Sequence, residues 1–174
     1  LRWMSPAGAG ARLSTLIFHR VLPAPDPLFP DEMDARRFAE VCGWLKSWFN
    51  VLPLDQAVTR LKAGTLPARA ASITFDDGYA DNFEVATPIL QRHGLTATFF
   101  IATGFLDGGR MWNDTIIETV RGGTSPLLDF SSLNLGRHPV ATLAGKRAAI
   151  TALIDQIKYR PVARRISITE QIAR

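Results

Sequence analysis

The stretch that decides the fold of this chain is Ser72-Ile73-Thr74-Phe75-Asp76-Asp77-Gly78-Tyr79. Its first half alternates β-branched or aromatic side chains with small polar ones, which predicts a strand. Asp76 and Asp77 follow, and two adjacent anions repel each other, so they need a metal ion, a cation or a shared proton as a partner. Gly78 lacks a Cβ and lets the backbone turn sharply. Ligands of α/β folds bind at the carboxyl ends of strands, so a site is predicted here.

The residues around this stretch resemble the polysaccharide deacetylases, the NodB-homology domains of carbohydrate esterase family 4. Residues 74–78 read Thr-Phe-Asp-Asp-Gly, which is the first motif of that family. A helix that ends near a glycine and an Ala-Thr-Phe-Phe strand follow this motif in the family, and they correspond here to residues 86–94 and 97–100. Residues 16–21 resemble the opening strand of one branch of the family. The resemblance extends over residues 13–112. Taken without these flanks, the motif is equally well interpreted as a solvated Asp-Asp-Gly turn.

Strands alternate with helices along the chain, which predicts parallel βαβ units. Residues 13–18 form a nearly continuous apolar run, typical of a strand that is buried on both faces. Asp34 is expected to cap the helix that follows. Trp44 and Trp48 lie on or beside the apolar stripe of that helix and are expected in the core. Thr115 opens a capping box, which predicts the start of a later helix.

The predicted fold class is therefore α/β. The resemblance implies a distorted seven-stranded β/α barrel of the polysaccharide deacetylase type, of which this chain carries the first half. In this interpretation residues 1–12 are an N-terminal extension, and residues 13–174 are a C-terminally incomplete deacetylase domain. The other half of the barrel is the partner that the chain is expected to lack.

The resemblance also implies a function, the removal of N-acetyl groups from an amino-sugar polysaccharide or oligosaccharide. Asp76 matches the family's catalytic base, and Asp77 matches its metal ligand. The expected cofactor is a divalent metal ion, zinc, with cobalt and nickel as alternatives. The family's other ligands come from a His-x-x-x-His pair, which this sequence lacks. The remaining ligands are therefore expected to lie outside this chain, and the chain alone is expected to be inactive.

Three further side chains are candidates for the site. His19 ends the opening strand and should face the same rim as Asp76, where it either orients the acid, contacts sugar or is hydrogen-bonded within a loop. Tyr79 lies close to the two acids in sequence. Trp112 follows the third strand's loop, where its ring either stacks on a sugar or packs against the next helix.

The composition limits the other possibilities. At 174 residues, with 47% hydrophobic and 21% charged residues, the chain is long enough for one globular domain with its own core. The net charge is +4, but the basic residues are dispersed, so no nucleic-acid partner is expected. Cys42, the single cysteine, is expected to be a buried, inert thiol.

The sequence gives little direct information on location. No apolar run approaches the ~20 residues of a membrane-spanning helix, so no transmembrane segment is expected. Residues 1–11 do not have the pattern of a signal peptide as they stand. The family resemblance implies the cell envelope, the periplasm or secretion.

Two alternative functions remain. The first is a catalytically inactive, carbohydrate-binding barrel, from which an enzyme would differ in its metal content. The second is a phospho-acceptor signalling domain, which also gathers acidic residues around a metal ion at strand ends. That class needs a lysine at the end of a later strand, and no predicted strand is followed by one.

Overall fold

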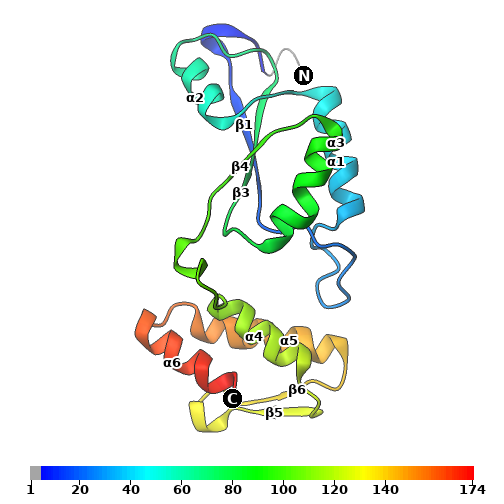
Figure 1. Cartoon of the computed structure of the whole chain (residues 1–174). Coiled ribbons are helices and arrows are strands. Elements are labelled where there is room, and N and C mark those ends of the chain that lie inside the picture. The colour runs from blue at the N-terminus through cyan, green and yellow to red at the C-terminus, as the bar shows by residue number, and fades with distance from the viewer. Residues whose placement is uncertain (1–4) are drawn as a thin grey trace. The chain divides into compact units, whose positions relative to one another are not determined.

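The computed structural model describes residues 5–174, which form two compact units, one up to Thr103 and the other Gly104–Arg174 (Figure 1). The first unit contains β1 (Leu13–Phe18), α1 (Ala35–Trp48), β2 (Asn50–Val51), α2 (Leu54–Lys62), β3 (Ala70–Phe75), α3 (Thr87–His93) and β4 (Ala97–Phe99). The second contains α4 (Trp112–Gly122), β5 (Leu127–Asp129), β6 (Arg137–Pro139), α5 (Leu143–Ile157) and α6 (Val162–Ile172). A five-residue π-helix, Asn82–Ala86, leads directly into α3.

The sheet of the first unit is built around β3. β1 pairs along one edge of β3, with Phe18 opposite Phe75. β2 pairs with the beginning of the other edge and β4 with its end, where Ile73 lies opposite Ala97. All three pairings are parallel, which confirms the α/β class. The seven-stranded barrel stays a prediction, because these strands form an open sheet.

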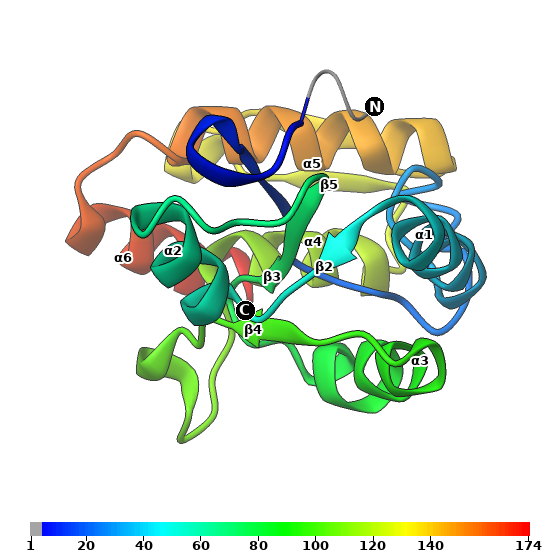
Figure 2. The same ribbon diagram turned by 90° about the horizontal axis from the view of Figure 1, so that it is seen from above.

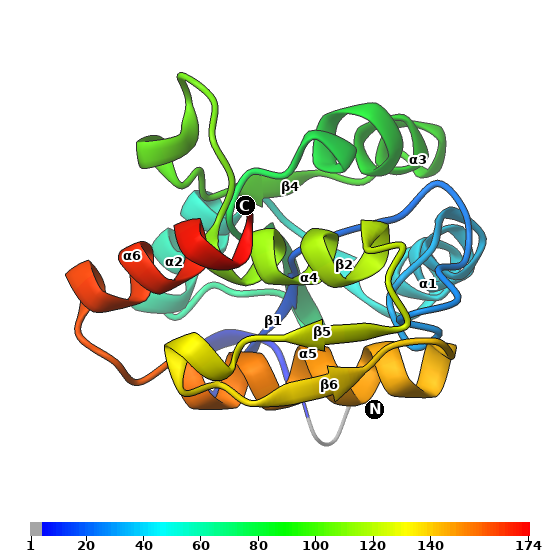
Figure 3. The same ribbon diagram turned by 90° about the horizontal axis from the view of Figure 1, so that it is seen from below.

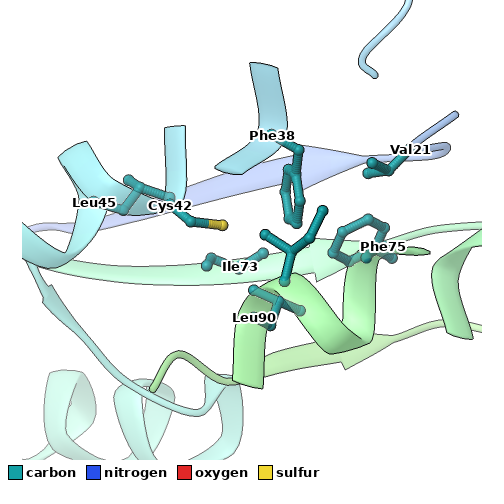
Figure 4. Packing of buried hydrophobic residues seen from close by; sticks show 9 residues of the cluster. Val21, Phe38, Cys42, Leu45, Ile73, Phe75 and Leu90 are labelled. Atoms are coloured by element: carbon teal, nitrogen blue, oxygen red, sulfur yellow. The ribbon is translucent and has the colours of Figure 1, made fainter. Parts of the chain in front are cut away.

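One face of β3 carries the core of the first unit. α1 and α3 lie side by side on one side of β3, and α2 lies on the other side (Figure 2). Ile73 and Phe75 point from β3 into the layer of α1 and α3 (Figure 4). The ring of Phe38 meets those of Phe18 and Phe75 edge to face, with centroids 5.2 and 5.7 Å apart. Aromatic pairs with this geometry stabilise a core beyond the apolar area that they bury.

The other face of β3 is buried although it carries polar side chains. The hydroxyl of Ser72 donates to the carbonyl oxygen of Leu52 at 2.9 Å, and the hydroxyl of Thr74 donates to the carbonyl oxygen of Leu16 at 3.3 Å. The neighbouring strands therefore satisfy the polar groups that this strand buries, as buried hydroxyls require.

Two expectations about burial in the first unit are wrong. β1 is not buried on both faces: its burial is uneven along the strand, and Ile17 is 61% exposed. Trp44 and Trp48 do not enter the core. They lie half exposed on α1, where their rings stack on each other with centroids 6.1 Å apart. Their positions border the apolar stripe of α1 and do not lie at its centre.

The two predictions of helix starts had different outcomes. Asp34 is the N-cap of α1 as predicted, and its side chain accepts a hydrogen bond from the Arg37 N–H at 2.9 Å. Thr115 does not cap α4, which begins at Trp112. The Thr115 hydroxyl donates instead to the carbonyl oxygen of Met111 at 3.1 Å, a bond that a threonine inside a helix makes with the preceding turn.

Cys42 is a buried thiol, as expected. It lies on the core face of α1 (Figure 4). Burial raises the pKa of this thiol from 9.0 to about 11. The thiolate is the reactive form of cysteine, so Cys42 is protonated and unreactive at neutral pH.

The second unit packs three helices and a hairpin around a core of its own. β5 and β6 are antiparallel, with Leu127 opposite Pro139, and β6 lies along α5 (Figure 3). The large apolar side chains that are fully buried in this unit are Ile116, Val120, Val140, Leu153, Ile157 and Ile168. None of the helices described in residues 5–174 has the length and apolar character needed to cross a membrane.

The Phe38→Ala substitution should lower the free energy of unfolding by about 3–5 kcal/mol, because it empties a fully buried aromatic site. Phe83→Ala is the matched control, since it removes the same atoms from a side chain that is 78% exposed. The control should change the free energy by less than about 0.5 kcal/mol. Urea denaturation followed by circular dichroism measures both values, and similar losses in the two variants would contradict the assignment of the core.

Candidate functional site

β1, β3 and β4 end at the same edge of the sheet because they run parallel. The ladder continues one residue beyond the strands. The Asp76 N–H donates to the carbonyl oxygen of Phe18 at 2.9 Å, and the Phe100 N–H donates to Phe75 at 2.8 Å. His19 is the residue that follows β1, and Asp76 and Asp77 follow β3. The structure therefore brings His19 to the same edge as the acidic pair, although His19 is far from the pair in the sequence.

The two carboxylates lie on a sharp turn. Asp77 has a φ of 72° and Gly78 a φ of 76°, so both residues are in the left-handed region. Asp is one of the few residues other than Gly that adopt this region with some frequency. A Cβ on Gly78 would lie 3.0 Å from the Ile101 side chain, so a larger residue would collide there as well. The turn thus requires glycine at 78 and strains the backbone at 77.

His19 is the nearest histidine to the acidic pair. Its Nε2 lies 4.0 Å from Oδ2 of Asp77, on the exposed side of the turn. This distance is too long for a direct hydrogen bond. His19 thus lies at the rim that its position after β1 suggested, and its function there stays a prediction, as do the roles of Asp76 and Asp77.

The described residues do not by themselves fit a catalytic metal centre. A catalytic zinc ion is usually held by three protein ligands, with a further position open to water. Within residues 5–174, no group of three or more His, Cys, Asp or Glu side chains is placed to hold a metal ion. His19 and Asp77 offer a pair of donors at most.

Each of the two aromatic candidates makes a cation–π contact with an arginine: Tyr79 with Arg20 and Trp112 with Arg165. The guanidinium carbon of Arg20 lies 4.6 Å from the centroid of the Tyr79 ring, a cation–π contact. Trp112 is the first residue of α4 in the second unit, and the guanidinium carbon of Arg165 lies 5.2 Å from its ring centroid. The contact of Trp112 is with a side chain of α6 (Val162–Ile172), and the choice between packing and stacking on sugar stays open.

Asp81 and Asn82 contact the segment that carries His19, and the residue patterns did not single them out as candidate site residues. Oδ2 of Asp81 accepts a hydrogen bond from Nε of Arg20 at 2.9 Å and forms an ion pair with Nη2 of Arg20 at 2.8 Å. Oδ1 of Asp81 accepts a hydrogen bond from the Val21 N–H at 3.2 Å. Nδ2 of Asn82 donates to the carbonyl oxygen of His19 at 2.9 Å. These bonds join residues about sixty positions apart, and no local pattern in the sequence announces them.

Comparison with known proteins identifies relatives of this chain. Residues 63–125 match the family model of the polysaccharide deacetylases. The Bacillus subtilis protein YxkH, assigned as a polysaccharide deacetylase, is 30% identical over 93 residues, which are 52% of this chain and 32% of YxkH. The match therefore spans about a third of the length of that relative.

Solved structures of deacetylases resemble this chain. The Streptococcus pyogenes deacetylase PplD, solved in complex with acetate, aligns with a TM-score of 0.50 and 15% identity over 92% of this chain and 80% of PplD. IcaB from Ammonifex degensii aligns with a TM-score of 0.48 and 20% identity over 97% and 82%. The de-N-acetylase from Aggregatibacter actinomycetemcomitans has a TM-score of 0.47 and 28% identity over 56% and 40%. The likeness to PplD concerns the fold alone.

The Asp77→Gly variant should be more stable than the Asp77→Ala variant by about 1–2 kcal/mol, because glycine adopts the left-handed φ of 72° without strain. Both variants lack the carboxylate, so the difference between them isolates the backbone. Thermal or urea unfolding measures it. Equal stability of the two variants would show that the turn at residue 77 is not strained.

Proposed function

We propose that this chain, whose residues 63–125 match the family model of the polysaccharide deacetylases, forms part of a hydrolase that removes N-acetyl groups from an amino-sugar polysaccharide or oligosaccharide. One observation carries the proposal. The acidic pair Asp76–Asp77 stands at the carboxyl end of the central strand β3, with His19 beside it. This is the edge of a parallel sheet at which α/β enzymes bind their ligands.

Asp76 is proposed as the general base. An acetamide is unreactive toward water, and a positioned carboxylate that takes a proton from the attacking water speeds such a reaction by about 10²–10⁴-fold. Among residues 5–174, no hydrogen bond or ion pair engages the carboxylate of Asp76. Its oxygens are therefore not committed to a structural contact within the described chain.

Asp77 is proposed as a ligand of a divalent metal ion, with zinc as the expected metal and cobalt and nickel as alternatives. Such an ion, when bound, lowers the pKa of a coordinated water and polarises a carbonyl oxygen. The imidazole of His19, 4.0 Å from the Asp77 carboxylate, is a neighbouring donor of a type that zinc accepts. The proposal requires at least one further ligand, because the described residues supply no group of three.

The strand ends argue against a phospho-acceptor domain. The four parallel strands are followed by His19, Leu52, Asp76 and Phe100, and none of these positions carries a lysine. A signalling domain of that class needs a lysine at the end of a later strand. The proposed substrate and the family resemblance instead suggest a location in the cell envelope, in the periplasm or outside the cell.

The two acids should differ in what they do to metal binding. In the full-length natural protein, Asp77→Ala should lose both bound metal and turnover. Asp76→Asn should keep the metal and lose turnover by about 10²-fold or more, because only the base is removed. Elemental analysis of the purified variants and release of acetate from acetylated chito-oligosaccharide measure the two properties. Equal metal retention in both variants would contradict these roles, and a metal-free wild type would favour an inactive sugar-binding barrel.

The 174-residue chain by itself should release no acetate above background when zinc or cobalt is added. Its described residues bring together two donors only, and without a bound metal the pKa of the attacking water stays far above the value that it has when bound to zinc. The assay uses the same acetylated oligosaccharide, with the full-length protein as the positive control. Turnover by the isolated chain would mean that the metal site is built from other residues.

A further inference from the structure

We propose that Asp81 and Asn82 are positioning residues that hold the His19 imidazole beside Asp77. The proposal rests on the function proposed above, in which His19 and Asp77 belong to the reaction site. The two residues fix the chain after β1 at the sheet edge. Without such a fixing contact, His19 would stand on a connecting segment that leaves the sheet.

Three consecutive residues after β1 are each held by the Asp81–Asn82 pair. The carbonyl oxygen of His19 accepts from Nδ2 of Asn82 at 2.9 Å. The guanidinium of Arg20 and the N–H of Val21 both donate to the Asp81 carboxylate, to its two different oxygens. The pair therefore sets the path of the backbone through His19, and with it the direction in which the imidazole leaves the chain.

The amide of Asn82 is itself firmly placed. Asn82 is the first residue of the π-helix Asn82–Ala86, and its carbonyl oxygen accepts both the N–H and the hydroxyl of Thr87, the latter at 2.9 Å. Its Nδ2 faces two oxygens, that of His19 and Oδ1 of Asp81, so the orientation of the amide is unambiguous. Single π-helical turns of this kind occur frequently at functional sites.

The burial of the pair argues that it serves geometry in addition to stability. Asp81 is 7% exposed and Asn82 is 4% exposed. The Arg20 side chain that pairs with Asp81 is 40% exposed, and ion pairs that solvent screens contribute little to stability. Oδ1 of Asn82 is buried, and no described residue donates to it, which costs free energy that an apolar side chain would not. The donor end of this amide, bonded to His19, is the part that the site uses.

The test measures the effect of the Asp77 charge on the His19 ring, with the contacts of Asn82 either intact or removed. The full chain, labelled at histidine, is prepared with Asp77 and with the Asp77→Asn substitution. The displacement is the change in the NMR chemical shift of the His19 ring between these two proteins. In an Asn82→Leu background this displacement should fall to about half or less, because the field of a charge weakens with distance. Asn82→Ser, whose shorter hydroxyl group does not reach the His19 carbonyl, is a second variant in case Asn82→Leu does not fold.

Leu66→Ala is the matched control for loss of stability. Leu66 is fully buried in a cluster with Ala57 and Ala70 at the beginning of β3, at the opposite end from the acidic pair. This control should lose free energy of unfolding and keep the full displacement of the His19 signal. An unchanged displacement in the Asn82 variants would overturn the proposal and leave Asp81 and Asn82 as purely structural residues.

The rate of acetate release provides a second, independent measurement. In the full-length natural protein, Asn82→Leu should lower kcat/KM for acetate release by about tenfold, the loss typical of residues that orient a metal-site ligand, whereas Leu66→Ala should leave it nearly unchanged. If the wild type releases no acetate but the NMR pattern is found, the proposed function fails and the positioning role stands. If acetate is released and the NMR pattern is absent, the positioning role alone is wrong.

Discussion

The parallel pairing of β1 with β3 is the constraint on which the site depends. Phe18 lies opposite Phe75, their rings stack with centroids 5.4 Å apart, and the Asp76 N–H bonds to the Phe18 carbonyl. This register places His19 beside the acidic pair. A slip of one residue would turn Phe75 out of the core, because successive side chains of a strand point to opposite faces. The apolar core therefore enforces the geometry of the polar edge.

The same strand explains why the turn at Asp77 persists. Ile73 and Phe75 anchor the end of β3 in the core, and the chain must then reverse within a short distance. Asp77 takes a left-handed φ, and its carbonyl oxygen accepts a hydrogen bond from the Ala102 N–H at 3.2 Å. A strained residue of this kind is retained only where the surrounding structure holds it, and such residues gather at functional sites.

Local signals in the sequence predicted elements well where the physical cause was itself local. The alternation of side chains identified β3, and Asp34 capped α1 because a carboxylate can bond the N–H groups of the next turn. Local signals in the sequence led to wrong predictions where contacts with distant parts of the chain determine which side chains are buried. The stripe of α1 did not reveal that Trp44 and Trp48 stack on the surface, since the helix face that is covered depends on the sheet beneath it.

The candidate site divides in the same way. By itself the sequence determined the acidic pair and its glycine turn, and through strand ends it suggested the rim position of His19, because these features follow from backbone geometry within a few residues. Only the tertiary structure decided that Asp81 and Asn82 bind the segment from His19 to Val21. That contact joins side chains about sixty residues apart, and no periodicity or capping rule specifies it. It forms because the pairing of β1 with β3 brings the two segments together.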